Sequence, residues 1–389
     1  MTAADHDVVV IGGGIHGVGV AQAAAAAGYS VLLLERERLA YGTSSRSSKL
    51  IHGGLRYLES AQFGLVRESL HERETLLRLA PELVRRVPFH IPVYRATRRR
   101  PWQIRAGLAL YSLLGGLASG AGFETVPRVQ WNDLDGLDVD GLQAVFRYQD
   151  AQTDDAALTR AVMRSAQTLG AELRCPANFL AAKRIGDSFT IHYLEDDGEH
   201  SCRATALVNA AGPWANTVLD RVTPRPSALP VELVQGAHLV LEGEIRCGVY
   251  YIEAPRDGRA VFVMPWQGKT LVGTTETPYE GDPAAVHARP EEIAYLRETL
   301  RHYFPRRGGE LLDSFAGLRV LAPGTGPVFR RPRETVLHPD HPERARLVTI
   351  YGGKLTGYRL TAAKVMRVLQ RSLPARERAA DTATLMLPP

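Results

Sequence analysis

The sequence has few features that would indicate a secreted, metal-bound or membrane-spanning protein. Its 389 residues include three cysteines, Cys175, Cys202 and Cys247, and no CxxC pair, so neither a zinc site nor a disulfide framework is predicted and a reducing, cytoplasmic setting fits. There is no run of about 18 apolar residues and no signal-peptide pattern, so neither a membrane span nor export is predicted. No metal site is expected.

Charge and size further restrict the class of protein and the expected number of domains. A net charge of +5 is modest for 389 residues and does not indicate nucleic-acid binding, although it suits an anionic substrate or a membrane surface. A content of 45% hydrophobic and 23% charged residues is typical of a soluble globular protein. The length exceeds that of one ordinary core, so two domains are expected.

Residues 7–35 carry the first specific signal. They read DVVVIGGGIHGVGVAQAAAAAGYSVLLLE, in which a β-branched run typical of a buried parallel strand leads into a GxGxxG turn. Gly12 allows a tight turn, Gly14 leaves room for a pyrophosphate, and Gly17 lets the next helix pack closely on the sheet. The spacing predicts a dinucleotide-binding βαβ unit.

The rest of this βαβ unit indicates which dinucleotides it can bind. An alanine-rich helix is expected over residues 15–27, with Gly28 as its C-cap, and its free N-terminal amides would hold phosphates. A second strand over residues 30–34 ends at Glu35, whose carboxylate can accept a hydrogen bond from a ribose 2′-hydroxyl. An acidic residue at that position favours FAD or NAD over NADP.

Two later stretches are predicted to lie on the ligand, and the second favours FAD over NAD. Residues 41–59, YGTSSRSSKLIHGGLRYLE, combine many hydroxyls with a Gly53-Gly54 pair that lets backbone approach a flat ligand. Residues 346–351 are expected to form a buried strand. The sequence GGKLT then forms a turn, and a helix that ends near Leu369 follows it. A second positive helix end could stabilise negative charge on a reduced flavin ring.

An arginine-rich segment is the candidate for membrane contact. Residues 95–114, RATRRRPWQIRAGLALYSLL, place a basic cluster before an apolar and aromatic helix that should begin near Pro101. This combination is typical of an interfacial anchor on anionic lipid, and equally of a solvated basic face over an ordinary core helix.

The remaining pattern outlines a second domain inserted into the dinucleotide fold. Helices are expected over residues 62–79 and 151–169, and a loop over 115–142. Strands are expected over residues 189–194 and 204–209. The short strands expected over residues 238–241, 249–252, 260–265 and 270–275 indicate a mixed sheet in the inserted domain.

These stretches together resemble the FAD-dependent glycerol-3-phosphate dehydrogenases, in register over nearly the whole chain. The most specific matches are SSKLIHGGLRYLE and GGKLT, and others are HERETLLRLAP, NAAGPW, QGAHLVL, GTTE and GLRVL. The resemblance implies an α/β fold with a glutathione-reductase-type FAD-binding Rossmann domain (1–94, 150–232 and 340–389) and an inserted mixed-sheet substrate domain (95–149 and 233–339).

The resemblance also implies an activity. The expected reaction is oxidation of sn-glycerol 3-phosphate at C2 to dihydroxyacetone phosphate, with hydride passing from C2 to flavin N5 and the electrons then to quinone. The enzyme would lie on the inner face of the cytoplasmic membrane.

Site residues follow from the resemblance by matched position. Cofactor-binding positions are Gly12, Gly14, Ile15, His16, Gly17, Glu35, Arg36, Thr43, Ser44, Ser48, Lys49, Leu50, His52, Gly53, Gly54, Ala211, Gly212, Trp214, Gly353, Lys354, Leu355 and Thr356. Substrate-binding positions are Arg56, Tyr57, Thr275, Glu276, Arg319, Arg333 and Lys354.

The expected chemistry gives three of the matched residues a catalytic role. His238 is the candidate base for the C2 hydroxyl proton, because an imidazole titrates near neutral pH. Cationic side chains would hold the phosphate dianion, and either Arg319 or Lys354 could instead steady the developing alkoxide.

Departures from the family pattern leave alternatives open. The chain stops at Pro389, before the family's usual helical C-terminal domain, which leaves the quinone site and the oligomeric state open, with a dimer as one option. Ala157 replaces an arginine and Glu276 an aspartate, so a related polyol phosphate or a small 2-hydroxy acid stays an alternative substrate. An oxidase that returns electrons to oxygen and a flavin-bound sensing module without turnover are the other hypotheses.

Overall fold

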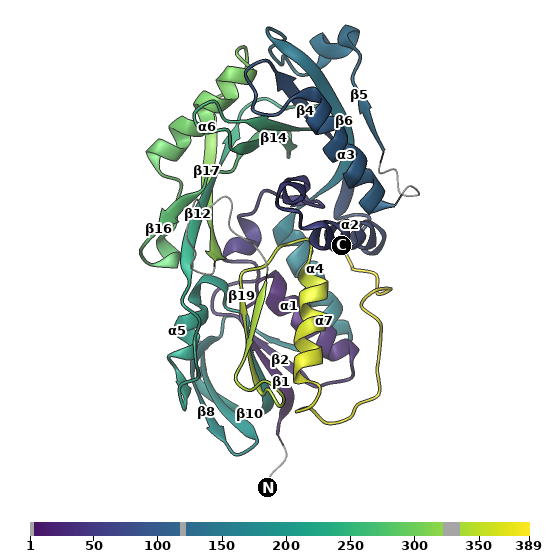
Figure 1. Cartoon of the computed structure of the whole chain (residues 1–389). Helices are drawn as coiled ribbons and strands as arrows, with labels where there is room; N and C mark the ends of the chain where they lie inside the picture. Colours follow the sequence, from purple (N-terminus) through teal and green to yellow (C-terminus); the bar gives the residue numbers. More distant parts are fainter. Residues whose placement is uncertain (1–3, 117–121, 322–334) are drawn as a thin grey trace.

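The computed structural model describes residues 4–116, 122–321 and 335–389. These residues form two large sheets, one of nine strands and one of ten, with helices packed against both (Figure 1). The predicted α/β architecture, a parallel dinucleotide-binding unit joined to a mixed sheet, is confirmed.

The nine-stranded sheet is built around β1 (His6–Ile11), which lies parallel to β10 (Gly198–Asn209) on one side and to β2 (Val31–Leu34) on the other. All of Val8–Ile11 and Val31–Leu34 are buried, as expected for parallel strands covered on both faces. The other strands are β7 (Glu172–Arg174), β8 (Asn178–Ile185), β9 (Ser188–Glu195), β11 (Val222–Thr223), β18 (Val336–Pro339) and β19 (Leu347–Tyr351).

Helices α1 (Ile15–Ala26), α4 (Asp155–Thr168) and α7 (Tyr358–Leu369) lie side by side against this sheet (Figure 1). α1 packs on both neighbours and is buried on almost every side, which explains its alanine and glycine content. A Cβ atom on Gly19 would lie 2.7 Å from Cδ2 of Tyr358. This close packing fixes the position of the α1 N-terminus at the carboxyl end of β1.

The ten-stranded sheet mixes parallel and antiparallel pairs. Its order is β16 (Thr277–Tyr279), β12 (Glu232–Leu241), β15 (Lys269–Gly273), β14 (Ala260–Trp266), β13 (Val249–Glu253), β4 (Val84–Tyr94), β6 (Leu142–Thr153) and β3 (Leu50–Ile51), with β17 (Leu311–Leu321) on β12 and β5 (Phe123–Thr125) on β6. The accompanying helices are α2 (Phe63–Leu79), α3 (Pro101–Gly115) and α6 (Pro290–Tyr303), and α5 (Ala215–Leu219) follows β10. Short 3₁₀ turns cover Thr43–Ser45, Leu55–Ser60, Arg128–Asp133, Gly212–Trp214 and Pro283–Ala285.

The prediction for residues 115–169 is wrong in two places. The predicted loop contains β5 and a 3₁₀ turn, and residues 142–153 form β6, so the first residues of the predicted 151–169 helix are in a strand. α4 begins only at Asp155 because Asp154 caps it: the Asp154 Oδ1 atom accepts a hydrogen bond from the Ala157 N–H at 2.9 Å.

Two predicted domain boundaries do not coincide with the division into sheets. β4, which lies before the boundary at residue 94, pairs along its whole length with β6 in the ten-stranded sheet. β18, which lies before the boundary at residue 340, pairs with β19 in the nine-stranded sheet. The domain boundaries otherwise stay a prediction.

A buried chain of hydrogen bonds ties α2, α3 and β6 to the Gly53-Gly54 turn. The Arg73 guanidinium donates to Asp150 Oδ1 at 2.6 Å, and the Tyr111 hydroxyl donates to Asp150 Oδ2 at 2.7 Å. The Gly53 N–H donates to the Tyr111 hydroxyl at 2.8 Å. Because Arg73, Asp150 and Tyr111 are all buried, these bonds hold the turn firmly in place.

No helix within the described parts of the chain combines the length and the apolar character that crossing a bilayer requires.

Candidate active site

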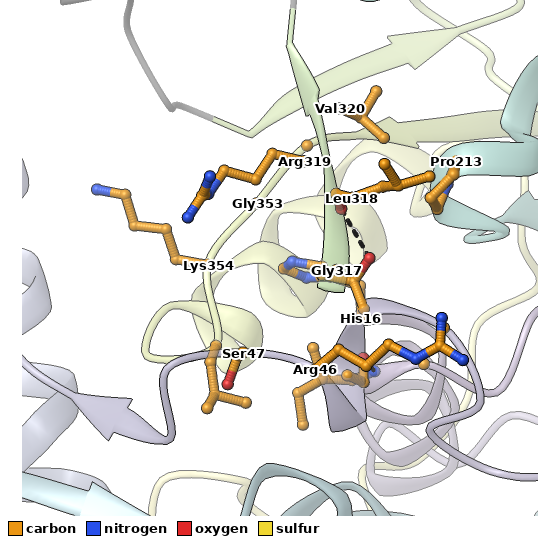
Figure 2. A pocket seen from close by; sticks show the side chains of 18 of the residues that line it. His16, Arg46, Ser47, Pro213, Gly317, Leu318, Arg319, Val320, Gly353 and Lys354 are labelled. Atoms are coloured by element: carbon orange, nitrogen blue, oxygen red, sulfur yellow. Dashed lines mark hydrogen bonds between the residues drawn. The ribbon is translucent and has the colours of Figure 1, made fainter. Parts of the chain in front are cut away.

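A cavity of about 560 Å³ extends from the β1–α1 turn to strands β12, β14 and β17 of the ten-stranded sheet. Its walls come from segments far apart in the sequence, among them the 41–57 region, the β10–α5 turn and the β19–α7 junction. Figure 2 shows part of this wall, with side chains from β17, α1 and the β19–α7 junction around one space. The site is therefore assembled only when both sheets are in place.

The β1 end of the cavity is shaped by glycine. Gly12 has a φ of +107°, and a Cβ atom there would lie 2.7 Å from the carbonyl oxygen of Ala210. A Cβ atom on Gly17 would collide with the carbonyl of Gly12. Gly12 and Gly14 line the cavity beside the first turn of α1, where backbone N–H groups can receive an anion.

Glu35 borders the same end of the cavity. Its two carboxylate oxygens accept hydrogen bonds from the Gly13 N–H at 2.6 Å and the Glu37 N–H at 2.9 Å. Each oxygen retains a lone pair, so the carboxylate can still accept from a sugar hydroxyl. The Arg36 guanidinium lies 5.3 Å from the ring centroid of Trp214 beside it.

The second strand-to-helix junction borders the cavity opposite α1. Gly353 has a φ of +116°, and a Cβ atom there would collide with the His16 imidazole. Burial lowers the pKa of His16 to about 4. Glycine at 353 thus lets the junction approach α1 while leaving room along its edge for a flat group.

His238 on β12 is a buried imidazole at the wall of the cavity, 2% exposed. Its Nε2 atom lies 2.9 Å from the Ser48 hydroxyl, and its ring stacks on Phe315 with centroids 5.0 Å apart. Burial, and after it the positive charges of Arg319 and Lys49, lower the pKa of His238 to about 3. The ring is therefore neutral near pH 7, which is the protonation state that a general base needs, while the lowered pKa makes it a weaker base than a free imidazole.

Cationic side chains converge on the same region. Arg319 on β17 donates to the Thr275 carbonyl and to the Thr274 hydroxyl, both at 3.3 Å, and burial followed by the charge of Arg56 lowers its pKa to about 10. Lys354 places its ammonium 3.8 Å from the ring centroid of Tyr57. Figure 2 shows Arg319 and Lys354 extending into the same part of the pocket.

Comparison with known proteins identifies the family. A family model described as FAD dependent oxidoreductase matches residues 7–363. The chain belongs to this family.

Several curated relatives of this FAD-dependent oxidoreductase have related names. It is 38% identical to a glycerol-3-phosphate dehydrogenase of Pseudomonas aeruginosa, covering 94% of this chain and 72% of the relative. It is also 38% identical to a D-erythritol 1-phosphate dehydrogenase of Brucella abortus, covering 95% and 74%. Among solved structures, the glycerol-3-phosphate dehydrogenase of Bacillus halodurans complexed with FAD matches with a TM-score of 0.74 and 27% identity, over 98% of this chain and 67% of that one.

The residues present fit FAD, and the prediction of this cofactor is confirmed by the family. The glycine-shaped turn at Gly12 and Gly14 can hold the pyrophosphate, and Glu35 can hold the ribose. The β19–α7 junction around Gly353 and Leu355, together with the 41–57 region, can hold the ring system. The cavity opens continuously from one set to the other.

Most of the predicted site residues line this cavity. From the cofactor set these are Gly12, Gly14, Ile15, His16, Glu35, Arg36, Thr43, Ser44, Ser48, Leu50, His52, Gly54, Ala211, Gly212, Trp214, Gly353, Lys354, Leu355 and Thr356. From the substrate and catalytic sets these are Arg56, Tyr57, His238, Glu276 and Arg319. Their individual roles stay predictions, and Arg333 lies outside the described residues.

Four predicted residues do not line the cavity. Gly17 packs against Gly12, and Gly53 is held by Tyr111. The Thr275 hydroxyl is buried: it accepts from the Ala237 N–H at 2.8 Å and donates to Glu292 at 2.6 Å. Lys49 directs its ammonium to Asp155 at 2.6 Å. In the structure these four residues contact the protein rather than the cavity, and their predicted ligand roles stay predictions.

Three further residues that the sequence did not predict for the site, Tyr251 on β13, Phe262 on β14 and Arg259 just before β14, also line the cavity. Tyr251 and Phe262 pack together with ring centroids 5.4 Å apart, and Arg259 donates to the Glu276 carbonyl at 3.0 Å. An arginine in a polar turn and aromatic residues in a strand are common in any sheet. No signal in the sequence distinguishes these residues from surface and core positions.

Buried histidines should make the stability of the fold pH-dependent. Burial lowers the pKa of His16 and His90 to about 4, and that of His238 to about 3. An unfolded histidine titrates near 6.5, so below that pH the unfolded chain takes up protons that the folded chain does not. The free energy of unfolding should fall by up to about 1.4 kcal/mol per histidine for each pH unit between 6.5 and the folded pKa.

Urea unfolding at pH 7.5, 6.5 and 5.5 tests this expectation. The midpoint should fall over the first step and should fall roughly three times as much over the second, because the unfolded histidines are half protonated at pH 6.5. A His90→Phe variant keeps an aromatic ring against Tyr250, with which His90 stacks at 5.2 Å, and should show a smaller fall. A midpoint that is equal at pH 7.5 and 5.5 would contradict the burial of neutral imidazoles.

Proposed function

We propose that this FAD-dependent oxidoreductase oxidises sn-glycerol 3-phosphate at C2 to dihydroxyacetone phosphate. The observation that carries the proposal is the pairing of a buried, neutral imidazole with guanidinium groups that lack a counter-ion. Among the described residues, neither Arg56 nor Arg319 forms a salt bridge with a carboxylate, although both line the cavity. Both guanidinium groups are half-buried on the cavity wall, where positive charge favours an anionic substrate.

The side chains suggest how such a substrate would bind. Arg56 and Arg319 can hold the phosphate through forked hydrogen bonds, and Lys354 adds a point charge that the Tyr57 ring orients. Arg319 is itself oriented by Thr274 and Thr275. Because these groups are pre-positioned, little ordering is needed when the phosphate arrives.

His238 would move the proton. When bound, FAD supplies the two-electron acceptor for the reaction. His238 takes the C2 hydroxyl proton, and the Ser48 hydroxyl at 2.9 Å sets the direction of its Nε2 atom. Lys354, which also lines the cavity, can instead steady the alkoxide that develops as the proton leaves.

A longer polyol phosphate is the second candidate substrate. The relative named D-erythritol 1-phosphate dehydrogenase is as similar to this chain as the one named glycerol-3-phosphate dehydrogenase. Both substrates carry a phosphate, so the cation group suits either. Of the two substituted positions, Ala157 and Glu276, it is Glu276 that lines the cavity.

A substrate panel tests the proposal. Rates with an artificial acceptor would be compared for glycerol 3-phosphate, D-erythritol 1-phosphate, glycerol and lactate. We expect kcat/KM for one polyol phosphate to exceed that for glycerol at least about 10³-fold, since two or more charge-assisted hydrogen bonds are lost without the phosphate. Preference for lactate would assign the site to 2-hydroxy acids instead.

Quinone is the proposed electron acceptor, and oxygen is the alternative. Support for quinone comes from the resemblance to glycerol-3-phosphate dehydrogenases rather than from a described quinone site. Turnover under air with glycerol 3-phosphate distinguishes the two: reduction of a soluble quinone without peroxide supports the proposal, and stoichiometric peroxide supports an oxidase. A protein that binds FAD and turns over no substrate would instead be a sensing module.

Helix α3 supports peripheral contact with the inner face of the cytoplasmic membrane. Leu108 and Tyr111 face the core, whereas Trp102 and Leu113 are 70% and 66% exposed on a stripe that also includes Ala106 and Ala109. Arg95, Arg98, Arg100 and Arg105 are exposed next to this stripe, while Arg99 is paired with Glu59 and Glu253. An apolar stripe flanked by exposed cations suits anionic lipid.

Vesicle sedimentation tests this contact. The protein should bind vesicles containing phosphatidylserine and leave neutral ones in solution, and a Trp102→Ala, Leu113→Ala variant should bind about tenfold more weakly. Ile185→Ala, which removes a side chain 57% exposed on β8, is the matched control and should bind normally. Equal binding by the double variant and the wild type would refute the role of α3.

A further inference from the structure

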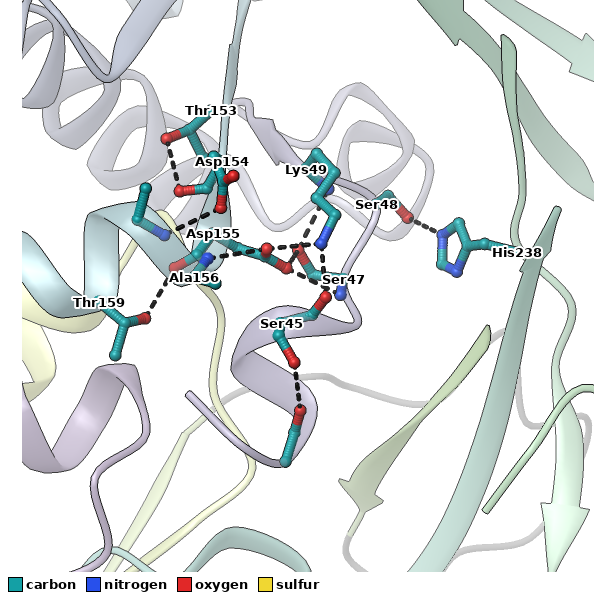
Figure 3. A network of polar contacts seen from close by, with 12 residues as sticks. Ser45, Ser47, Ser48, Lys49, Thr153, Asp154, Asp155, Ala156, Thr159 and His238 are labelled. Carbon is teal, nitrogen blue, oxygen red and sulfur yellow. Dashed lines mark hydrogen bonds and ion pairs between the residues drawn. The ribbon is translucent and has the colours of Figure 1, made fainter. Parts of the chain in front are cut away.

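One buried carboxylate forms hydrogen bonds to two residues of the segment 45–49 (Figure 3). Asp155, at the first position of α4, is fully buried. Its Oδ2 atom accepts hydrogen bonds from the Ser47 hydroxyl at 2.6 Å and from the Ser47 N–H at 3.0 Å. Its Oδ1 atom accepts from the Lys49 ammonium at 2.6 Å and from its neighbour's N–H in α4. Asp155 thus binds both residues that flank Ser48.

Lys49 completes this arrangement. Its ammonium, which is almost fully buried, also donates to the Ser45 carbonyl at 2.5 Å, so one side chain closes the segment on itself. Lys49 has a φ of +59°, a left-handed conformation that costs free energy in any residue other than glycine. The surrounding bonds therefore impose this backbone conformation on the segment.

The same segment presents Ser48 to His238. Ser48 lies between the two residues that Asp155 holds, and its hydroxyl is 2.9 Å from His238 Nε2 on β12 (Figure 3). On the other side, the Lys49 ammonium lies 5.3 Å from the centroid of the Phe315 ring, on which His238 stacks. The Asp155–Lys49 ion pair therefore holds the residue on either side of Ser48 and lies beside Phe315, and neither of its members lines the cavity.

We propose that Asp155 and Lys49 are positioning residues that fix the segment 45–49 so that Ser48 sets the orientation of His238. This inference rests on the proposed function only in taking His238 as the base. It replaces the predicted role of Lys49 as a cofactor ligand with a role behind the site. It also gives Asp155 a role other than helix capping, which Asp154 performs.

The neighbouring acids supply a matched pair of variants. Asp155→Asn should remove the ion pair, and Asp154→Asn should affect only the cap of α4. In the FAD-loaded full chain, Asp155→Asn should slow anaerobic bleaching of the flavin by glycerol 3-phosphate about 10- to 100-fold, because small displacements of a reacting group cost rates of this size. The substrate concentration at half-maximal rate should change less than about threefold, since no phosphate ligand moves. Asp154→Asn should stay within about twofold of the wild type.

Hydrogen exchange of the backbone provides a second readout that does not depend on turnover. Peptides that cover residues 43–51 should exchange at least about tenfold faster in Asp155→Asn than in Asp154→Asn, while peptides in β1 and β19 should be unchanged. If the wild-type flavin is not bleached by any polyol phosphate, the proposed function fails, and the exchange comparison alone decides whether Asp155 holds the segment.

A milder variant covers the case in which Asp155→Asn does not fold. Ser47→Ala removes one hydroxyl bond to Asp155 and keeps the ion pair, and it should slow bleaching about threefold to tenfold with the same faster exchange of residues 43–51. Normal bleaching and normal exchange in a folded Asp155→Asn, or in Ser47→Ala where that variant decides, would overturn the proposal. Loss of substrate affinity in step with the rate would also overturn it.

Discussion

Replacing His238 with alanine should slow reduction of the bound flavin by glycerol 3-phosphate about 10²- to 10⁴-fold, the usual contribution of a positioned general base. The dissociation constant of the substrate, taken from the concentration dependence of the same rates, should change less than about threefold. The physical reason is that the ring is buried and neutral, with its Nε2 atom held by Ser48 at 2.9 Å, so it can take a proton without first losing one. Stopped-flow absorbance of the anaerobic holoenzyme measures both quantities.

The control for this variant is His90→Phe. His90 is also a buried histidine of the ten-stranded sheet, but it stacks on Tyr250 and does not line the cavity. It should leave flavin reduction unchanged. If His238→Ala lowers rate and affinity by equal factors, His238 is a binding group and another residue removes the proton.

Replacing Arg319 with alanine should weaken binding of the phosphate substrate about 10²- to 10³-fold, because its guanidinium can make more than one charge-assisted hydrogen bond to a phosphate. Arg319→Lys keeps the charge and loses the forked pair of hydrogen bonds, so its affinity for the phosphate substrate should lie between those of the wild type and Arg319→Ala. The neutral polyol glycerol lacks the phosphate, so its low kcat/KM should change little in either variant. The ratio of kcat/KM for the two compounds measures the phosphate contribution directly.

Arg147→Ala is the matched control for Arg319. Arg147 also extends from a strand of the ten-stranded sheet, but it pairs with Glu124 on the surface and does not line the cavity. It should bind substrate normally. An Arg319→Ala variant with unchanged affinity for glycerol 3-phosphate would move the phosphate site to other cations.

The parts of the fold that could be predicted are those specified by local sequence. Gly12 has a φ of +107°, and Gly17 leaves no room for a Cβ atom beside the Gly12 carbonyl, so the GxGxxG spacing alone was informative. The strand β4 shows the opposite case. Pro88 and Pro92 and the exposed Arg85-Arg86 pair hide a strand that is recognisable only by its long-range pairing with β6.

The site was predictable to the extent that its residues face a ligand. His238, Arg319 and Lys354 come from separate segments, and family motifs rather than spacing indicated that they would meet. Lys49 and Thr275 are polar residues in the same motifs, but their partners Asp155 and Glu292 lie elsewhere in the chain. A sequence pattern shows that a polar residue is needed and does not show whether it faces the cavity or supports it.

The most direct test of the central claim, that this cavity holds FAD beside a phosphate-binding cation group and a proton-accepting imidazole, is an anaerobic titration of the purified yellow protein with glycerol 3-phosphate. We expect loss of the visible flavin absorbance, with dihydroxyacetone phosphate formed in proportion. A protein that takes up no flavin, or a flavin that stays oxidised with glycerol 3-phosphate and with every other polyol phosphate, would contradict it.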